Sequence, residues 1–223
     1  MEVKIKYGLD KDTKKIKHIS EVEKGEKSNC ICIECGNTLI ARKGKIQKHH
    51  FQHKSNTNCS GGEPETLLHK IGKKIIKDND KILLSNDLFF DYSTVKLEER
   101  LNDYKPDAIV FNNQGESWLI EIAVTHFIDD SKEEKIKRDQ RNCIEITLQP
   151  DLIYEKPNKI EDEVLNNPEN RVIINDVKGR FDKELNNNLK AKVEKKWMPY
   201  IISGTVLYLF RKQIKRVLKK VFS

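Results

Sequence analysis

The sequence predicts an α/β fold, in which a mixed-sheet core follows a small β-hairpin module rich in cysteine and histidine. The clearest element is a hairpin, because apolar, β-rich runs at 104–111 and 117–126 flank the polar turn 112–116. Residues 65–77 have apolar side chains at helical spacing. Cysteines and histidines occur in pairs between residues 30 and 53, as in small metal-binding modules.

The composition is that of a soluble chain with one medium domain and an appendage, because 223 residues contain 37% apolar and 35% charged side chains. The first residues alternate in charge and do not form a signal peptide. The longest apolar stretch, Met198–Phe210, is interrupted by proline, serine and glycine and is too short for a membrane span. We therefore expect a cytoplasmic protein whose five cysteines stay reduced or bind metal.

Positive charge is concentrated at the C-terminal end. Residues 190–223 contain ten Lys or Arg and one acid, a net charge of +9, so residues 1–189 carry −2 of the total of +7. Such an asymmetry indicates a polyanionic partner or a membrane surface. Residues 211–222 have an apolar and a basic helical face. This helix either packs on the domain with its basic face solvated, contacts a nucleic-acid backbone, or lies on an acidic membrane surface.

The N-terminal part is predicted to be a hairpin that leads into a metal-binding knuckle. Residues 3–7 alternate between apolar and charged, residues 9–12 turn the chain, and residues 16–19 form the return strand. Gly61-Gly62 then breaks the chain. The expected domains are the hairpin and zinc-binding knuckle (1–60), the α/β core (61–150) and a C-terminal extension with the basic helix (151–223).

Four side chains have the pairwise spacing of a tetrahedral Zn²⁺ site: Cys32, Cys35, His50 and His53. Cys30 and His49 are close enough in sequence to replace one of them. Cys59 is expected to be a small buried residue or a spare thiol. Because a site closed by four protein ligands leaves no position for a substrate, this zinc is expected to fold the module and not to catalyse.

An amphipathic helix is predicted over 65–77, with Leu68, Ile71 and Ile75 in its apolar stripe. Glu65 and His69 are four residues apart and therefore share one face. They are either members of a site or an exposed pair at a helix start, where an acid also suits the helix dipole.

The following elements alternate between strands and helix. Apolar, β-rich runs at 82–84 and 88–92 precede the hairpin, and a polar helix with acids at its start is expected over 129–140. Residues 143–148 form a further strand. The order helix, strand, hairpin, helix, strand indicates a core with a mixed sheet.

Two carboxylates in the hairpin are candidates for a metal-binding site. Asp107 begins the first strand, and Glu121 lies inside the apolar second strand, where a carboxylate is costly to bury unless it binds a cation. Adjacent strands would bring the two carboxylates together, and Mg²⁺ prefers such oxygen ligands. The pair therefore predicts a magnesium site able to hydrolyse phosphodiesters. The alternatives are a solvated Asp107 in an ordinary Pro-Asp turn and a Glu121 on an exposed strand face.

Several short motifs follow one another over about residues 5–150. In order they are Cys32-x-x-Cys35-Gly36, Ala41-Arg42-Lys43-Gly44, His49-His50-Phe51-x-His53, Glu65-x-x-x-His69-Lys70, Pro106-Asp107, Glu121-x-x-x-Thr125-His126, Lys132 and Ile144-Glu145-Ile146. With this order and spacing the chain resembles the competence protein CoiA-like family within the PD-(D/E)xK nuclease superfamily.

The resemblance implies a restriction-endonuclease-like core, an α-β-β-β-α-β mixed sheet, preceded by the zinc-binding knuckle. It implies that Asp107 and Glu121 are the metal ligands and that Glu65 is the helix-borne acid that completes the site. Thr125 and His126 would line the pocket, together with His69.

One position departs from the superfamily pattern. Ala123 stands two residues after Glu121, where the motif has lysine. The superfamily tolerates a lysine moved to the following helix, which makes Lys132 the matching candidate and Lys135 the second.

These observations predict a Mg²⁺-dependent deoxyribonuclease with a structural zinc, acting in DNA uptake, recombination or defence. The alternative is a non-catalytic, zinc-containing module that binds nucleic acid in DNA processing. A third possibility is a zinc-stapled interaction protein anchored by its basic C-terminal segment. DNA is the expected partner of the first two, and an acidic membrane surface is an expected partner of the basic helix.

Overall fold

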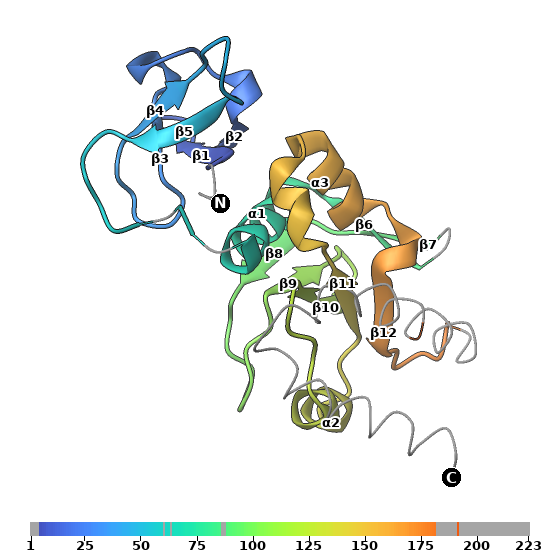
Figure 1. Ribbon diagram of the computed structural model, residues 1–223. Coiled ribbons are helices and arrows are strands. Elements are labelled where there is room, and N and C mark those ends of the chain that lie inside the picture. Colours follow the sequence, from blue (N-terminus) through green and yellow to red (C-terminus); the bar gives the residue numbers. More distant parts are fainter. Residues whose placement is uncertain (1–4, 60, 63, 86–87, 182–190, 192–223) are drawn as a thin grey trace. The chain divides into compact units, whose positions relative to one another are not determined.

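The structure is a computed structural model that describes residues 5–59, 61–62, 64–85, 88–181 and 191 (Figure 1). The chain divides into two units, Met1–Phe181 and Asp182–Ser223, and the elements named below belong to the first. The basic helix expected over 211–222 lies outside the described residues. Among the residues that are described, no helix combines the length and the apolarity needed to cross a bilayer.

The N-terminal module contains two small antiparallel sheets. Its elements are β1 (Tyr7–Asp10), β2 (Ile16–His18), η1 (Ile19–Glu21), η2 (Glu26–Ser28), β3 (Cys30–Ile31), β4 (Leu39–Arg42) and β5 (His50–His53). One sheet has the order β2-β1-β3 and the other pairs β4 with β5. The predicted first hairpin is present, but its first strand is Tyr7–Asp10 and overlaps the predicted strand 3–7 only at Tyr7. The Asp10 carboxylate accepts hydrogen bonds from the backbone of Asp12 and Thr13, so the turn starts after this residue.

The second group of elements forms a mixed α/β core, which confirms the predicted fold class. They are α1 (Pro64–Asp78), β6 (Lys81–Ser85), β7 (Leu88–Asp91), β8 (Thr94–Leu97), β9 (Ala108–Phe111), β10 (Ser117–Ala123), α2 (Asp130–Arg138), β11 (Cys143–Thr147), η3 (Pro150–Tyr154), α3 (Pro157–Leu165), η4 (Pro168–Asn170) and β12 (Arg171–Asn175). A five-stranded sheet has the order β12-β11-β10-β9-β8, in which β10 and β11 are parallel and the other pairs antiparallel. The β6-β7 hairpin forms a separate two-stranded sheet.

The sheet continues past residue 150, at which the sequence places the end of the core. β12 pairs with β11 as an edge strand, and α3 contributes Ile160 and Val164 to the same hydrophobic core as α1. Residues 151–175 therefore belong to the folded core and not to an extension.

The two faces of the sheet are covered by different helices (Figure 1). Ile120 and Ile122 of β10 share a hydrophobic core with Leu68 and Ile71 of α1. A side chain added at Gly72 of α1 would place its Cβ 2.7 Å from Ile122, so glycine allows this close approach. Because strand side chains alternate between faces, the residue between the two isoleucines points to the opposite face, over which α2 lies.

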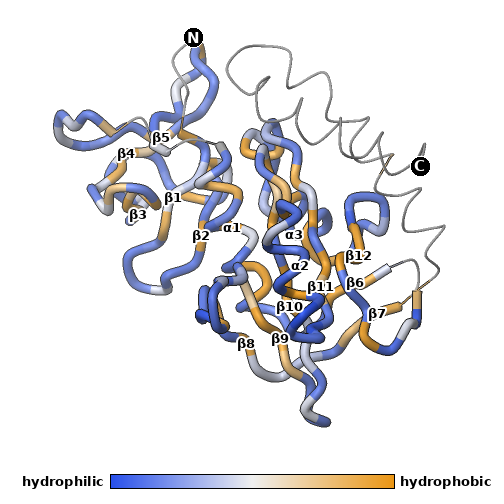
Figure 2. The backbone as a smooth tube through the Cα atoms, turned by 90° about the horizontal axis from the view of Figure 1, so that it is seen from below, coloured by the Kyte–Doolittle hydropathy of each residue, from blue (hydrophilic) through white to orange (hydrophobic). Residues whose placement is uncertain are grey.

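The central strands supply most of the apolar surface of the sheet, whereas α2 is largely hydrophilic (Figure 2). The one buried residue of α2 is Ile136. This helix is therefore attached to the sheet by a small apolar contact, and its N-terminal end is stabilised by Asp129, whose carboxylate accepts a hydrogen bond from the Lys132 amide.

A buried arginine joins β12 to the rest of the core through hydrogen bonds. Arg171, which is 1% exposed, donates hydrogen bonds to the carbonyl oxygens of Leu83 (2.6 Å), Val164 (2.5 Å) and Asn167 and to Asn170 Oδ1 (2.8 Å). Burial lowers the pKa of the guanidinium to about 9. Its hydrogen-bond acceptors are carbonyl oxygens, so removing the side chain would leave several buried backbone acceptors without a donor.

Candidate functional site

Three thiols and one imidazole converge in the N-terminal module. The ligand atoms of Cys32, Cys35, His53 and Cys59 all lie within 4.8 Å of one another. Cys32 Sγ is 3.9 Å from Cys59 Sγ, and Cys35 Sγ is 3.3 Å from His53 Nε2. In a tetrahedral site with Zn–S bonds of about 2.3 Å, two sulfur atoms lie about 3.8 Å apart. The four side chains therefore fit Zn²⁺ in both chemistry and spacing, and this cluster can hold the ion.

The fourth ligand differs from the one expected. His50 and His53 are three residues apart on β5, and strand side chains alternate between faces, so the two rings point to opposite sides. His50 Nδ1 lies 2.9 Å from the Lys48 carbonyl oxygen, and Cys59 takes the place assigned to His50. Cys30 is also outside the cluster, because its buried thiol donates to the Ser28 carbonyl oxygen.

The surroundings of the cluster suit a metal site. Burial lowers the pKa of His53, which keeps the imidazole neutral and available as a ligand. Burial also raises the pKa of the Cys32 thiol to about 11. Because zinc binds the thiolate, a bound ion would have to displace this proton, and zinc affinity would fall as the pH is lowered.

A zinc measurement on two variants tests the corrected ligand set. Purified Cys59→Ser protein is expected to contain far less zinc than wild type and to lose the fold of residues 5–59, because structural zinc sites supply folding free energy. His50→Ala is the matched control and is expected to keep its zinc. Atomic absorption and thermal unfolding of both proteins measure this. Full zinc content in Cys59→Ser with loss in His50→Ala would restore the original assignment.

The register of the hairpin brings the two carboxylates together. Ile120 pairs with Ala108 across the antiparallel strands β10 and β9, so Glu121 lies opposite Asp107 at the end of β9. The Ile122 amide donates a 2.9 Å hydrogen bond to Asp107 Oδ2. The two carboxylates are close enough for the charge of Asp107 to raise the pKa of Glu121.

Glu121 is a buried carboxylate next to a lysine. Its side chain is 7% exposed, and its Oε1 lies 2.7 Å from Lys132 Nζ of α2. The pKa of Glu121 is raised to about 7, because burial and the charges of Asp107 and Glu145, which raise it, outweigh Lys132, which lowers it. The ion pair is short but poorly directed, since Oε1 has no hydrogen-bond donor at suitable angles among the described residues. The lysine predicted from α2 therefore lies beside Glu121.

Asp107 has basic neighbours from α1. His69 Nδ1 lies 3.4 Å from Asp107 Oδ2, and Lys73 Nζ lies 3.6 Å from Oδ1. Lys73 also pairs with Glu98. Burial raises the pKa of Asp107, but the hydrogen bonds from His69 and Ile122 and the charge of Lys73 outweigh it and hold the pKa below its usual value. Asp107 is therefore ionised at neutral pH.

Glu65 lies in a separate cluster with the residues after β10. Its carboxylate accepts hydrogen bonds from Thr125 Oγ1 and, at 2.7 Å, from His126 Nδ1. Burial raises the pKa of Glu65, but these bonds outweigh it and lower the pKa. The charge of His69 lowers the pKa of Glu65 as well. Glu65 itself contacts the loop and not the hairpin carboxylates.

Two further side chains are not at the centre of the site: Lys135 lies outside it and Glu145 lies behind Glu121. Lys135, the second lysine candidate, pairs with Asp103 at 3.3 Å and does not reach Glu121. Glu145 lies next to Glu121 in the parallel ladder and accepts a 2.5 Å hydrogen bond from the Ile128 amide. Glu145 thus anchors the loop that leads to α2 and places a second buried carboxylate beside Glu121.

Residues 11–62 match the family model of the competence protein CoiA, N-terminal domain. This segment is similar to the N-terminal domain of CoiA. The matched segment contains all four members of the cysteine–histidine cluster, and it ends before α1. Neither curated proteins nor solved structures gave a match. The match confirms the resemblance to the CoiA-like family over residues 11–62, and the assignment of the following core to the PD-(D/E)xK superfamily is a proposal.

Three residues near the site, Lys73, Glu145 and Glu98, were not among the candidates predicted from the sequence. Lys73 follows Glu65 and His69 at intervals of four, and this spacing places all three on one helix face. Glu145 is an acid inside an apolar strand, which is the signal that identifies Glu121. Glu98 gives no comparable signal, because it belongs to a charged run after β8.

The raised pKa of Glu121 predicts how stability depends on pH. With a pKa of about 7 in the folded state and of 4.5 when unperturbed, the stability that Glu121 contributes is present below pH 4.5 and is lost as pH rises through 7. Glu121→Gln mimics the protonated carboxyl at every pH. It is expected to match wild type near pH 5 and to be more stable by about 2–3 kcal/mol near pH 8.

Urea unfolding of both proteins across this range, without added Mg²⁺, provides the measurement. A stability difference between Glu121→Gln and wild type that stays constant with pH would show that Glu121 titrates normally in the folded state.

Proposed function

We propose that this protein is a Mg²⁺-dependent nuclease that hydrolyses DNA phosphodiesters, built on a restriction-endonuclease-like core with a structural zinc module. One observation supports it above the others: Lys132 Nζ lies 2.7 Å from the buried Glu121, which supplies the amine that Ala123 cannot. Apart from the β6-β7 hairpin, which follows α1 and forms a separate sheet, the element order α1, β8–β10, α2 and β11 agrees with such a core. The CoiA-like family suggests a competence-related role.

The donor set fits a hard cation. Asp107 directly precedes β9 and Glu121 lies on the adjacent β10, and burial together with the acidic neighbours raises the pKa of Glu121. A cation between them would lower that pKa and relieve the repulsion. Mg²⁺ keeps several waters and takes only one or two carboxylates from a protein, so these two residues are sufficient to hold it. When bound, the ion would polarise the phosphoryl group and lower the pKa of a bound water.

Lys132 would stabilise the reacting phosphate. Its ammonium is held beside Glu121 and also donates a 3.2 Å hydrogen bond to the Lys105 carbonyl oxygen. These contacts fix the positive charge at the carboxylate pair, where it can orient a water molecule or stabilise negative charge developing on phosphate oxygens. His69 and Lys73 extend the positive surroundings on the α1 side.

Glu65 has a positioning role in this proposal. Its contacts with Thr125 and His126 fix the segment that joins β10 to α2, and α2 holds Lys132. His126 is 65% exposed, so its ring remains accessible to substrate at the rim of the site.

The same ion pair favours a second candidate function. Lys132 neutralises Glu121 without any metal, and a site neutralised in this way can bind nucleic acid without cutting it. The protein would then be a non-catalytic, zinc-containing nucleic-acid-binding module. Salt-sensitive DNA binding by wild-type protein with no Mg²⁺-dependent cleavage would establish this alternative.

A comparison of two lysines on the same helix tests the nuclease proposal. Lys132→Ala is expected to slow Mg²⁺-dependent cleavage by about 100-fold or more, because removing one donor to a developing oxyanion has effects of this size. Lys135→Ala removes the same charge from α2 but contacts Asp103, so it is expected to cleave like wild type. Cleavage of linear and circular DNA under single-turnover conditions measures both. Equal rates for the two variants would exclude a catalytic Lys132.

A further inference from the structure

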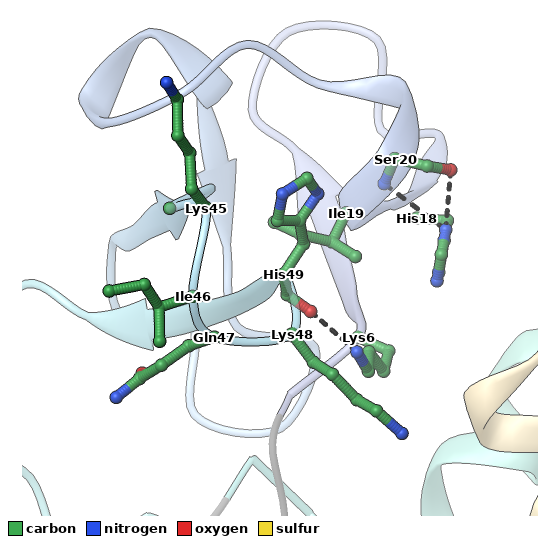
Figure 3. Close-up of a pocket in the computed structure, with 10 residues that line it drawn as sticks. Lys6, His18, Ile19, Ser20, Lys45, Ile46, Gln47, Lys48 and His49 are labelled. Carbon is green, nitrogen blue, oxygen red and sulfur yellow. Dashed lines mark hydrogen bonds between the residues drawn. The ribbon is translucent and has the colours of Figure 1, made fainter.

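A basic cavity lies in the N-terminal module, beside the loop between β4 and β5 (Figure 3). It has a volume of about 510 Å³ and no acidic residue in its lining. Three lysines and two histidines contribute to that lining: Lys6, Lys45, Lys48, His18 and His49. Lys6 Nζ donates a 2.6 Å hydrogen bond to the His49 carbonyl oxygen and so fixes one end of the loop. The lining therefore carries basic side chains and no acid, and the nearby Glu21 accepts a hydrogen bond from the His18 amide.

Two loop lysines are not neutralised within the module. Other lysines of the N-terminal and core elements pair with acids, for example Lys54 with Glu26 at 2.9 Å and Lys70 with Glu34 at 2.8 Å. Lys45 and Lys48 have neither an ion pair nor a side-chain hydrogen bond to any described residue, and their side chains extend away from the loop (Figure 3). Their charge is thus available to an anionic partner.

An apolar side chain stands between these lysines. Ile46 is 99% exposed, whereas the other exposed large apolar side chains among the described residues are at most half exposed. It contributes nothing to the core of the module. Isoleucine is one of the residues that DNA-binding proteins insert between bases, while flanking lysines contact the phosphates.

We propose that the loop formed by residues 43–49 is a DNA-binding element, in which Lys45 and Lys48 neutralise backbone phosphates and Ile46 contacts bases. The inference deepens the proposed function, because it rests on DNA as the substrate and names a second DNA contact outside the Asp107–Glu121 site. Burial of one isoleucine stabilises by only about 1.5–3 kcal/mol, so the loop alone is a weak membrane anchor. DNA carries a negative charge on every phosphate of its backbone, so it better matches the two unpaired lysines.

Fluorescence anisotropy with the full-length, zinc-loaded protein tests this loop. The probes are a labelled DNA duplex and one of its single strands, at several salt concentrations and without Mg²⁺. Lys45→Ala/Lys48→Ala is expected to weaken binding by about 10-fold and to reduce the slope of log K against log salt by about 1.4–1.8. Ile46→Ala is expected to weaken binding several-fold with an unchanged slope, because it removes no charge.

Matched controls separate this inference from loss of fold and from the nuclease proposal. Lys24→Ala/Lys27→Ala removes two exposed lysines of the same module that do not line the cavity, and it is expected to bind like wild type. All loop variants should keep their zinc and their unfolding temperature.

The outcomes differ for the two proposals. Loop variants that bind like the Lys24/Lys27 control, or that lose only binding to phosphatidylserine vesicles, would overturn the loop proposal and leave the nuclease proposal intact. If the wild-type protein binds DNA through the loop but never cleaves it, the loop proposal stands and the nuclease proposal fails.

Discussion

Replacement of Glu121 with glutamine is expected to slow Mg²⁺-dependent DNA cleavage by about 1000-fold or more, in line with the largest effects seen for single electrostatic contacts in active sites. Glutamine has the size of the buried glutamate but no charge, so one proposed ligand of the cation is lost. Lys132, held 2.7 Å from the carboxylate in wild type, also loses its ionic partner. Single-turnover cleavage of a labelled duplex over a range of Mg²⁺ concentrations measures the loss.

Glu145→Gln is the control for this variant. Glu145 is a second buried carboxylate on the neighbouring strand, but its contact is with the Ile128 amide. Its replacement should reduce the rate far less than the Glu121 variant. Cleavage by Glu121→Gln at the wild-type rate would remove the hairpin carboxylates from the mechanism. Recovery at high Mg²⁺ would show that the carboxylate serves binding of the ion more than the chemical step.

Replacement of Arg171 with methionine is expected to lower the free energy of unfolding by about 3–5 kcal/mol, because several buried acceptors each lose a donor at a cost of about 1–3 kcal/mol. Methionine fills much of the volume but donates no hydrogen bond. The carbonyl oxygens of Leu83, Val164 and Asn167 would then be buried without donors. These carbonyls belong to β6, to α3 and to the segment after α3. The substitution therefore removes the hydrogen bonds that join Arg171 of β12 to these segments. Urea unfolding gives the free energy directly.

Arg138→Met provides the matched comparison for this stability change. Arg138 forms ion pairs with Asp103 and Asp139 at 2.9 Å, but its side chain is 55% exposed, so its removal should lower the free energy of unfolding far less than the Arg171 change. Similar losses for the two variants would mean that burial of Arg171 contributes little.

The hairpin at the centre of the core was predictable because its signals are local. Asn and Gly residues in the turn, apolar runs of strand length and the Glu inside the second run determine the pairing, and the register follows from the loop. The structure places β9 and β10 within the predicted runs. The position of Lys132 beside Glu121 depends on how α2 packs against the sheet, which no local pattern reports. Only the family resemblance suggested it.

The zinc ligands show where sequence spacing fails. The interpretation of His50 and His53 as a ligand pair rested on their sequence spacing, which does not say to which side of an element each ring points. β5 is a strand, which sends the two rings to opposite sides. Cys59 joins the cluster through a long loop after β5, and the distance between ends of such a loop has no sequence signal.

The continuation of the core past residue 150 was missed for a related reason. A proline and polar, Asn-rich composition mark residues 150–170 as a boundary, yet this segment contains α3 and ends at Arg171. The pairing of β12 with β11 depends on that buried arginine, whose hydrogen bonds join segments 88 residues apart in sequence. Non-local contacts of this kind lie outside any window of sequence.

The attachment of α2 by one buried residue, Ile136, has a consequence for heat sensitivity. A motif lysine on β10 would be held by the central strand of the sheet and would be lost only on global unfolding. Lys132 belongs instead to a short polar helix, which can detach at a lower free energy than the sheet. Thermal inactivation of the proposed nuclease would therefore begin below the melting temperature of its core, as a reversible loss of activity that cooling restores.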